Sequence, residues 1–247
     1  MRRRTLLTAA MLTGIAGCRD EPGRLTIPDA PIGAERVERR FSAARGRLVD
    51  FYTAVPHGHG DGRGLPVCLV LHGGSRRPPD FPGLGLGRHL TAAAREHPPF
   101  VLAGATGDRL AWRPHPGDDP QRMVREEIPA WCAERGFDIS RIAVWGWSMG
   151  GAGALSLAMT FPDFVRAVAA FSPAVTPGDA VSTGAAKLSG IPVGLWCGTG
   201  DDLLDAVRAL PVEPAAGRYG PGGHDFTYWS TIVPEAFAFV AGRLTPA

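Results

Sequence analysis

Apolar runs alternate with amphipathic stretches along most of the chain. Apolar runs predict buried strands, because strands covered on both faces lack a polar alternation. The run at residues 66–71 is continuous, and further strands are predicted at 100–105, 141–147, 164–171 and 191–197. Helical patterns follow them at residues 84–97, 120–135 with an interruption near Pro129, 149–160, 202–210 and 234–244. Strands alternating with helices predict an α/β fold with a mostly parallel sheet and helices on both faces.

Three further segments complete this pattern. Two short extended runs about Arg45-Gly46, within residues 41–55, predict an antiparallel hairpin at a sheet edge, and residues 212–219 predict a weaker strand. The segment 172–190 contains Pro, Gly and Ser and is short for an inserted domain. We expect it to form only a small cap, which would leave an open cleft.

The first residues have the pattern of an export signal. Residues 1–17 combine a basic start, an apolar stretch too short to span a bilayer, and small residues before Cys18. Arg3-Arg4 resembles a twin-arginine signal, and Ile15-Ala16-Gly17-Cys18 resembles the lipobox of bacterial lipoproteins. We therefore expect Cys18 to be lipidated, residues 18–40 to be a tether, and residues 41–247 to form one domain. Ordinary cleavage and free secretion is the alternative.

Charge and cysteine content narrow the class of protein. The whole chain has a net charge of +2, but residues 1–17 hold three of the 26 basic side chains and none of the 24 acidic ones, so the remainder is near −1. This balance does not suggest a nucleic-acid partner. Cys68, Cys132 and Cys197 have no close spacing, which favours buried free thiols over a disulfide framework or a metal site. A Cys68–Cys197 bridge would require neighbouring strands.

A sharp turn between a strand and a helix carries the first candidate catalytic residue. Gly146-Trp147-Ser148-Met149-Gly150 matches G-x-S-x-G at the junction between the predicted strand at 141–147 and the helical pattern at 149–160. This turn holds a serine in a strained conformation, and it needs glycines where a side chain would collide with the neighbouring strand and helix. The pattern predicts that Ser148 is a nucleophile at the carboxyl edge of the sheet.

Two later loops supply candidate partners for this serine. Asp201 follows the run at 191–197, and His224 follows the last predicted strand behind a glycine run. The order Ser, Asp, His is that of α/β-hydrolase triads, with His224 as the base and Asp201 as the residue that orients it. Asp202 and Asp205 are alternatives for the acid, although Asp202 could cap the following helix and Asp205 lies within it.

Other residues are expected to complete the site. An oxyanion hole is predicted from the backbone N–H groups of Met149, after the nucleophile, and Gly74, in the glycine-rich turn after the run at 66–71. Trp112, Trp147 and Trp229 are candidates for lining the substrate pocket. No metal or organic cofactor is implied by the sequence.

The chain resembles the α/β-hydrolase esterases of the esterase D type, which include S-formylglutathione hydrolases, feruloyl esterases and mycobacterial mycolyltransferases. The resemblance covers about residues 41–245 and rests on His72-Gly73, residues 112–127, Gly146-Trp147-Ser148-Met149-Gly150-Gly151, the loop 198–201 and Gly222-Gly223-His224. It implies an α/β-hydrolase fold and a carboxylic-ester hydrolase or acyltransferase. Trp147 departs from the His or Leu of many relatives, so their substrates do not transfer.

The expected function is that of an exported serine esterase held by a lipid anchor on the outer face of the cytoplasmic membrane. Its substrate would be a small-molecule, lipid or carbohydrate ester, cleaved through an acyl-enzyme intermediate. Two alternatives stay open. The enzyme could pass the acyl group to a sugar or lipid hydroxyl, or the chain could be a non-catalytic binding lipoprotein that retains the fold.

Overall fold

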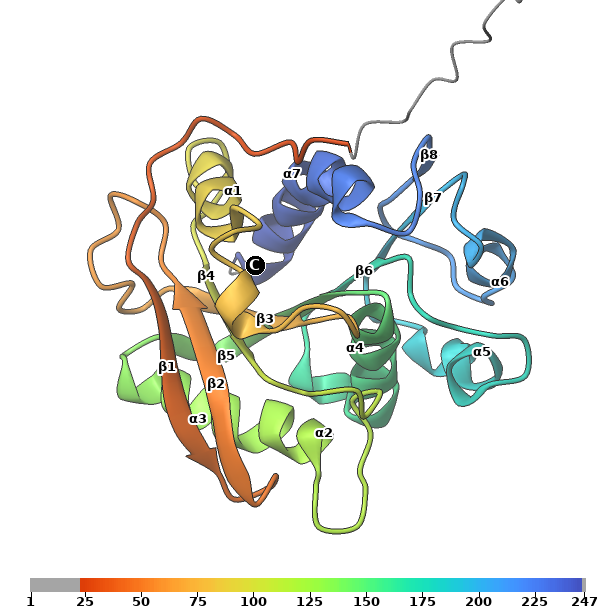
Figure 1. Cartoon of the computed structure of the whole chain (residues 1–247), viewed down its shortest axis with the longest axis horizontal. Helices are drawn as coiled ribbons and strands as arrows, with labels where there is room; N and C mark the ends of the chain where they lie inside the picture. Colours follow the sequence, from red (N-terminus) through yellow and green to blue (C-terminus); the bar gives the residue numbers. More distant parts are fainter. Residues whose placement is uncertain (1–22, 246–247) are drawn as a thin grey trace, which may run out of the picture.

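The protein is built on one eight-stranded sheet in the order β1-β2-β4-β3-β5-β6-β7-β8. The computed structural model (Figure 1) describes residues 23–245. β1 and β2 form an antiparallel hairpin at one edge, β2 is antiparallel to β4, and all pairs from β4 to β8 are parallel. The strands are β1 (Glu35–Ser42), β2 (Arg47–Ala54), β3 (Pro66–Leu71), β4 (Val101–Ala105), β5 (Asp138–Trp147), β6 (Val168–Phe171), β7 (Val193–Gly198) and β8 (Tyr219–Gly220). The predicted mostly parallel α/β architecture is confirmed.

Helices cover both faces of this sheet. α1 and α7 pack together on one face, and α3 and α4 pack on the other (Figure 1). The helices are α1 (Leu86–Ala93), α2 (Pro120–Arg122), α3 (Ile128–Glu134), α4 (Met149–Thr160), α5 (Ala180–Gly184), α6 (Leu204–Arg208) and α7 (Phe226–Leu244). A π-helical turn (Met123–Glu127) joins α2 to α3, and short 3₁₀ turns lie at Pro78–Asp80, Pro162–Phe164 and Ala185–Leu188. No helix within residues 23–245 is long and apolar enough to span a bilayer.

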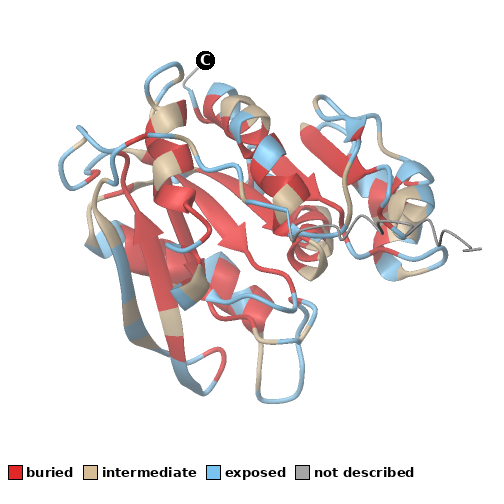
Figure 2. Ribbon diagram, turned by 45° about the horizontal axis from the view of Figure 1, so that its top comes forward, coloured by how far each residue is buried: buried red, intermediate tan, exposed pale blue. Residues whose placement is uncertain are grey.

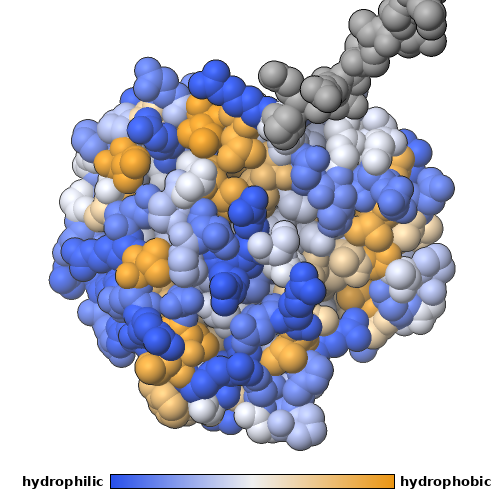
Figure 3. Space-filling view, in the orientation of Figure 1, coloured by the Kyte–Doolittle hydropathy of each residue, from blue (hydrophilic) through white to orange (hydrophobic). Residues whose placement is uncertain are grey.

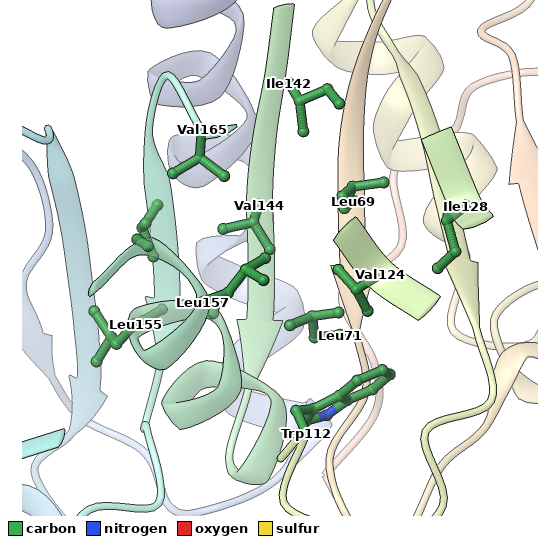
Figure 4. Packing of buried hydrophobic residues seen from close by; sticks show 14 of the residues in the cluster. Leu69, Leu71, Trp112, Val124, Ile128, Ile142, Val144, Leu155, Leu157 and Val165 are labelled. Carbon is green, nitrogen blue, oxygen red and sulfur yellow. The ribbon is translucent and has the colours of Figure 1, made fainter. Parts of the chain in front are cut away.

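The central strands are apolar throughout because each of their faces meets a different layer of helices. In β3, Val67, Leu69 and Leu71 belong to the core cluster under α3 and α4, whereas Cys68 and Val70 belong to the cluster under α1 and α7. Figure 2 shows these strands buried along their length, and Figure 4 shows Leu69 beside Val124 of the π-helical turn and Ile128 of α3. Successive strand side chains point to opposite faces, so a two-sided core requires an uninterrupted apolar run.

The N-terminal border of the domain differs from the prediction. β1 begins at Glu35, so residues 35–40 of the predicted tether form the edge strand of the sheet. Before β1, the Thr26 N–H donates to Ser230 Oγ at 2.9 Å, and the Thr227 hydroxyl donates to the Gly23 carbonyl at 3.0 Å. These contacts join the chain before β1 to α7. The predicted export signal and Cys18 lie outside the described residues.

The C-terminal part also departs from the pattern. The predicted strand at 212–219 is reduced to β8 and one isolated bridge between Gly194 and Ala216. The final helix starts at Phe226 rather than at residue 234, because Asp225 caps it by accepting the Tyr228 N–H at 3.1 Å, and Pro234 lies in its interior. Burial of most of one side of α7 maintains the helix through the proline.

The three described cysteines are buried free thiols, as the sequence favoured. Cys68 lies in β3 and Cys197 in β7, and two other strands, β5 and β6, separate them in the sheet, so no bridge joins them. Burial raises the pKa of Cys132 to about 12 and the pKa of Cys197 to about 11. These thiols therefore stay protonated at neutral pH and serve as small core side chains.

Candidate active site

Ser148 sits in a strained turn between β5 and α4. Its backbone has φ +54° and ψ −123°, a conformation that costs energy for a residue with a side chain. A Cβ on Gly150 would lie 1.9 Å from the Leu71 carbonyl oxygen, and one on Gly146 would lie 2.4 Å from the Gly150 carbonyl oxygen. Only glycine fits at these two positions, as the G-x-S-x-G pattern predicted.

The structure brings Ser148, His224 and Asp201 into one hydrogen-bonded chain. His224 Nε2 lies 2.8 Å from Ser148 Oγ, and His224 Nδ1 lies 2.9 Å from Asp201 Oδ2. The Asp201 side chain is fully buried, whereas the His224 ring is partly exposed. The carboxylate can accept only from an Nδ1–H, which leaves Nε2 to accept the serine proton. This is the geometry required to activate a serine hydroxyl.

Hydrogen bonds keep Asp201 ionised despite its burial. Burial alone would raise the pKa of Asp201, but hydrogen bonds from Ser172, the Leu203 N–H and His224 outweigh it and hold the pKa below its ordinary value. The Leu203 N–H lies 2.9 Å from Asp201 Oδ1. The two alternative acids, Asp202 and Asp205, are exposed. Asp202 also does not cap α6, whose N-cap is Leu203.

Ser172 is a site residue that the sequence reasoning missed. It follows β6, is fully buried, and has φ +40°. Its hydroxyl oxygen accepts the Trp229 Nε1–H at 3.1 Å while the hydroxyl is hydrogen-bonded to Asp201. Its position directly after a parallel strand, at the edge where site residues gather, was the available signal. Ser172 thus connects the carboxylate to the aromatic wall of the pocket.

A buried neutral histidine positions the glycine-rich turn beside the serine. His72 Nδ1–H donates to the Gly73 carbonyl at 2.7 Å, and His72 Nε2 accepts the Gly107 N–H at 2.8 Å. Burial lowers the pKa of His72 from 6.5 to about 4, so the ring is uncharged at neutral pH. A Cβ on Gly73 would lie 3.2 Å from Ser148 Cβ, which shows how close this turn approaches the serine.

The pocket beside Ser148 has one aromatic wall and one polar wall. It encloses about 290 Å³, and its aromatic wall is formed by Trp147, Phe226 and Trp229. Its polar side is formed by residues 73–76, Arg109, His224 and Asp225. No residue of the segment 172–190 lines it, although that segment forms α5 and a 3₁₀ turn.

Trp147 and Trp229 line the pocket, as the sequence predicted. For Trp112 the predicted substrate-lining role is wrong. Trp112 is 1% exposed and belongs to the core (Figure 4), where its Nε1–H donates to the His72 carbonyl at 3.1 Å. Its large ring fills space over Gly107 and Gly153, where a Cβ would collide with it. Trp112 therefore supports the glycine-rich turn from behind and does not reach the pocket.

One predicted oxyanion donor lines this pocket, and the other follows Ser148 in the chain. Gly74 lines the pocket, and Met149 is the first residue of α4, so the Met149 N–H has no acceptor within the helix. The positive end of the α4 dipole is directed toward Ser148. Within residues 23–245, no group of three His, Cys, Asp or Glu side chains is arranged to hold a metal ion.

Comparisons with known proteins give a family and a set of similar folds. The family model described as Esterase matches residues 42–240. Among solved structures, a ferulic acid esterase has a TM-score of 0.73 at 19% identity, covering 87% of this chain and all of that one. The fluorophosphonate-binding serine hydrolase F of Staphylococcus aureus has a TM-score of 0.70 at 17% identity, covering 85% of this chain and 99% of that one.

A third similar structure is an S-formylglutathione hydrolase from Agrobacterium tumefaciens, with a TM-score of 0.67 at 18% identity, covering 87% of this chain and 99% of that one. No curated protein sequence gives a significant match. At these identities the structural similarity shows the α/β-hydrolase fold.

Proposed function

The chain belongs to the Esterase family of carboxylic-ester hydrolases, and we propose that it cleaves its ester with Ser148 as nucleophile, His224 as general base and acid, and Asp201 as the orienting carboxylate. The observation that carries this proposal is the continuous hydrogen-bonded chain from Ser148 Oγ through His224 to Asp201. The strained turn at Ser148 supports it, because strain of this kind persists where the fold holds a reactive side chain in place.

The acylation step follows from these contacts. Ser148 Oγ attacks the ester carbonyl carbon while its proton passes to His224 Nε2. The imidazolium that results is stabilised by Asp201, whose pKa is held low enough to keep it charged. His224 then protonates the leaving alkoxide, the carbon–oxygen bond of the ester breaks, and the acyl group stays on Ser148.

Deacylation repeats the same transfers with water as the nucleophile. His224 takes a proton from water, the hydroxide attacks the acyl-enzyme carbonyl, and His224 returns the proton to Ser148 Oγ as the acid is released. In both steps the oxyanion is stabilised by the N–H groups of Gly74 and Met149. Each donor of this kind contributes about 3 kcal/mol to lowering the barrier.

A covalent probe tests the catalytic roles. We expect a fluorophosphonate to add one label to the folded domain, detected by intact mass, and we expect the label to be absent in Ser148→Ala and strongly reduced in His224→Ala. Ser189→Ala is the matched control, because Ser189 is exposed and outside the pocket. Absence of labelling in folded wild type, or labelling that persists in Ser148→Ala, contradicts the proposed mechanism.

We further propose that the enzyme is exported and held at the membrane through a lipid on Cys18. Support comes from the sequence pattern of residues 1–18. Expression of the full chain in a bacterial host should place the protein in the membrane fraction, with incorporation of a labelled fatty acid. Cys18→Ala should abolish that incorporation. A wild-type protein that carries no lipid rules out the anchor while leaving the esterase mechanism intact.

A further inference from the structure

Three arginine side chains surround the mouth of the pocket next to Ser148. Arg76 and Arg77 follow the glycine-rich turn after β3, and Arg109 lies in the loop after β4. Arg76 and Arg109 line the pocket that contains Ser148, and all three line an adjoining hollow of about 490 Å³. In Figure 3 strongly hydrophilic side chains gather over this part of the surface, where Figure 1 shows the loop after β3.

The charges of these arginines are not neutralised by neighbours. In the described part of the chain, no carboxylate lies within 4.0 Å of a guanidinium nitrogen of Arg76, Arg77 or Arg109. Asp108 is the carboxylate that shares the hollow, and it is already paired with Arg45 at 2.8 Å.

The other carboxylates close to the mouth are also engaged. Asp225, on the far side of the pocket, accepts the Tyr228 N–H and caps α7. Asp80 accepts the backbone N–H of Arg77 at 2.8 Å, and its carboxylate does not pair with the guanidinium of that residue. These hydrogen bonds do not remove the charges of Asp80 and Asp225, but Arg76, Arg77 and Arg109 still outnumber these two carboxylates by one. The mouth therefore carries a small surplus of positive charge, in a protein whose domain is close to neutral as a whole.

Arg109 is held in place by the site itself. Its Nε–H donates to the Gly74 carbonyl at 3.0 Å, so the guanidinium is tied to the turn that carries a proposed oxyanion donor. The loop bearing Arg109 is anchored by Arg45, whose buried guanidinium hydrogen-bonds to the Thr106 carbonyl and to Asp108. A guanidinium fixed through Nε keeps its terminal N–H groups free for a ligand.

We propose that the pocket takes an ester that carries an anionic oxyacid group, a carboxylate or a phosphate, a few bonds from the scissile carbonyl. The anion would bind Arg76 and Arg109, with Arg77 adding to the local potential, because guanidinium groups bind such oxyanions with paired, charge-assisted hydrogen bonds. The apolar part of the substrate would face Trp147, Phe226 and Trp229. This inference rests on the proposed esterase mechanism and specifies its substrate class.

Matched ester pairs test the inference. The first arm compares 4-nitrophenyl hemiglutarate, with a carboxylate on the acyl side, with neutral 4-nitrophenyl pentanoate. The second arm places the anion on the leaving group and compares 4-acetoxybenzoate and 4-acetoxyphenyl phosphate with phenyl acetate. For each enzyme we take the ratio of kcat/KM for the anionic ester to kcat/KM for the neutral ester. Comparing this ratio between wild type and a variant removes differences in intrinsic ester reactivity, because these are the same for both enzymes. The ester pair whose ratio falls in the arginine variants identifies whether the site prefers a carboxylate or a phosphate, and whether the anion lies on the acyl side or on the leaving group.

We expect Arg76→Gln and Arg109→Gln each to lower the anionic-to-neutral ratio about fivefold, and the double variant to lower it more than tenfold, as for partly exposed charge pairs. Added salt should weaken the preference by screening. Arg95→Gln is the control, because Arg95 is exposed at the end of α1 and removes the same charge far from the pocket. It should leave the ratio unchanged.

The outcomes separate the inference from the mechanism on which it rests. If the neutral ester is hydrolysed in a Ser148-dependent way and the ratio is the same in wild type and the double variant in every arm, the esterase mechanism stands and the anion site is refuted. If wild type hydrolyses none of the esters and takes no fluorophosphonate label, the mechanism fails; if it is labelled, the mechanism stands. In either case calorimetric titration of Ser148→Ala with glutarate then tests the anion site. Saturable binding that Arg76→Gln weakens supports the anion site, and absence of binding overturns it.

Discussion

The buried histidine of α1 should control how the stability of the domain falls in acid. His89 is 2% exposed, and within the described residues neither of its ring nitrogens has a hydrogen-bond partner. Burial lowers the pKa of His89 from 6.5 to about 4. The substitution His89→Leu removes this group while keeping a side chain of similar size on a helix that already buries Leu86 and Leu90.

The sign and size of the effect follow from proton linkage. Between pH 6.5 and about 4 the unfolded chain binds a proton at His89 that the folded chain does not bind, so the free energy of unfolding falls as the pH falls through this window. The full loss amounts to about 3 kcal/mol, of which about 2.5 kcal/mol is complete at pH 4.5. Because whole domains have about 5–15 kcal/mol of stability, the loss is a large fraction of it.

Urea unfolding followed by tryptophan fluorescence at pH 7.5 and pH 4.5 measures this difference. We expect His89→Leu to be at least as stable as wild type at pH 7.5, since no hydrogen bond is lost, and to lose about 2.5 kcal/mol less on acidification. His57→Leu is the control, because His57 is exposed, and it should keep the wild-type pH dependence. Parallel pH curves for wild type and His89→Leu would show that His89 is not held neutral by burial.

Two further substitutions test the turn that holds Ser148 and the hydrogen bonds around Asp201. Gly150→Ala should destabilise the domain by at least about 3 kcal/mol in thermal and urea melts and abolish fluorophosphonate labelling, because its Cβ would lie 1.9 Å from the Leu71 carbonyl oxygen. Gly242→Ala is the control: its Cβ would have nothing within 4 Å, so it should stabilise α7 by about 0.5–1 kcal/mol in the same melts.

Ser172→Ala should lower kcat/KM about tenfold, because Asp201 loses a hydrogen bond that lowers its pKa and helps it to hold the His224 ring. Ser172→Gly, which also relieves the φ of +40°, should be equally impaired, and recovery of activity in this variant would show that backbone strain and not the hydroxyl matters.

The parts of the fold that could be predicted are those whose signals are local. β3 and α4 have the predicted bounds, because an uninterrupted apolar run and a glycine turn before an Ala/Leu-rich stretch leave few alternatives. Ser148, Asp201 and His224 could be selected together because each follows a strand of a parallel sheet, and the carboxyl ends of such strands meet at one edge.

The remainder depends on contacts between distant segments. The position of Ser172 between Trp229 and Asp201 follows from how β6 lies against β7 and α7, which no local pattern encodes. Trp112 lies in a loop and resembles a pocket residue by position, yet left-handed backbone at Trp112 turns its ring into the core. The start of α7 was displaced in the prediction because Pro234 resembles a helix start more than Asp225 does.

The contacts between the chain before β1 and α7 fix when the domain can be completed during synthesis. Thr26 and Ser230 are 204 positions apart, as are Gly23 and Thr227. At ordinary rates of translation, roughly 10–40 s separate the synthesis of the two segments. Throughout that interval the strand faces that α7 covers have no helix over them, so the nascent chain is most prone to aggregate just before its last helix is made.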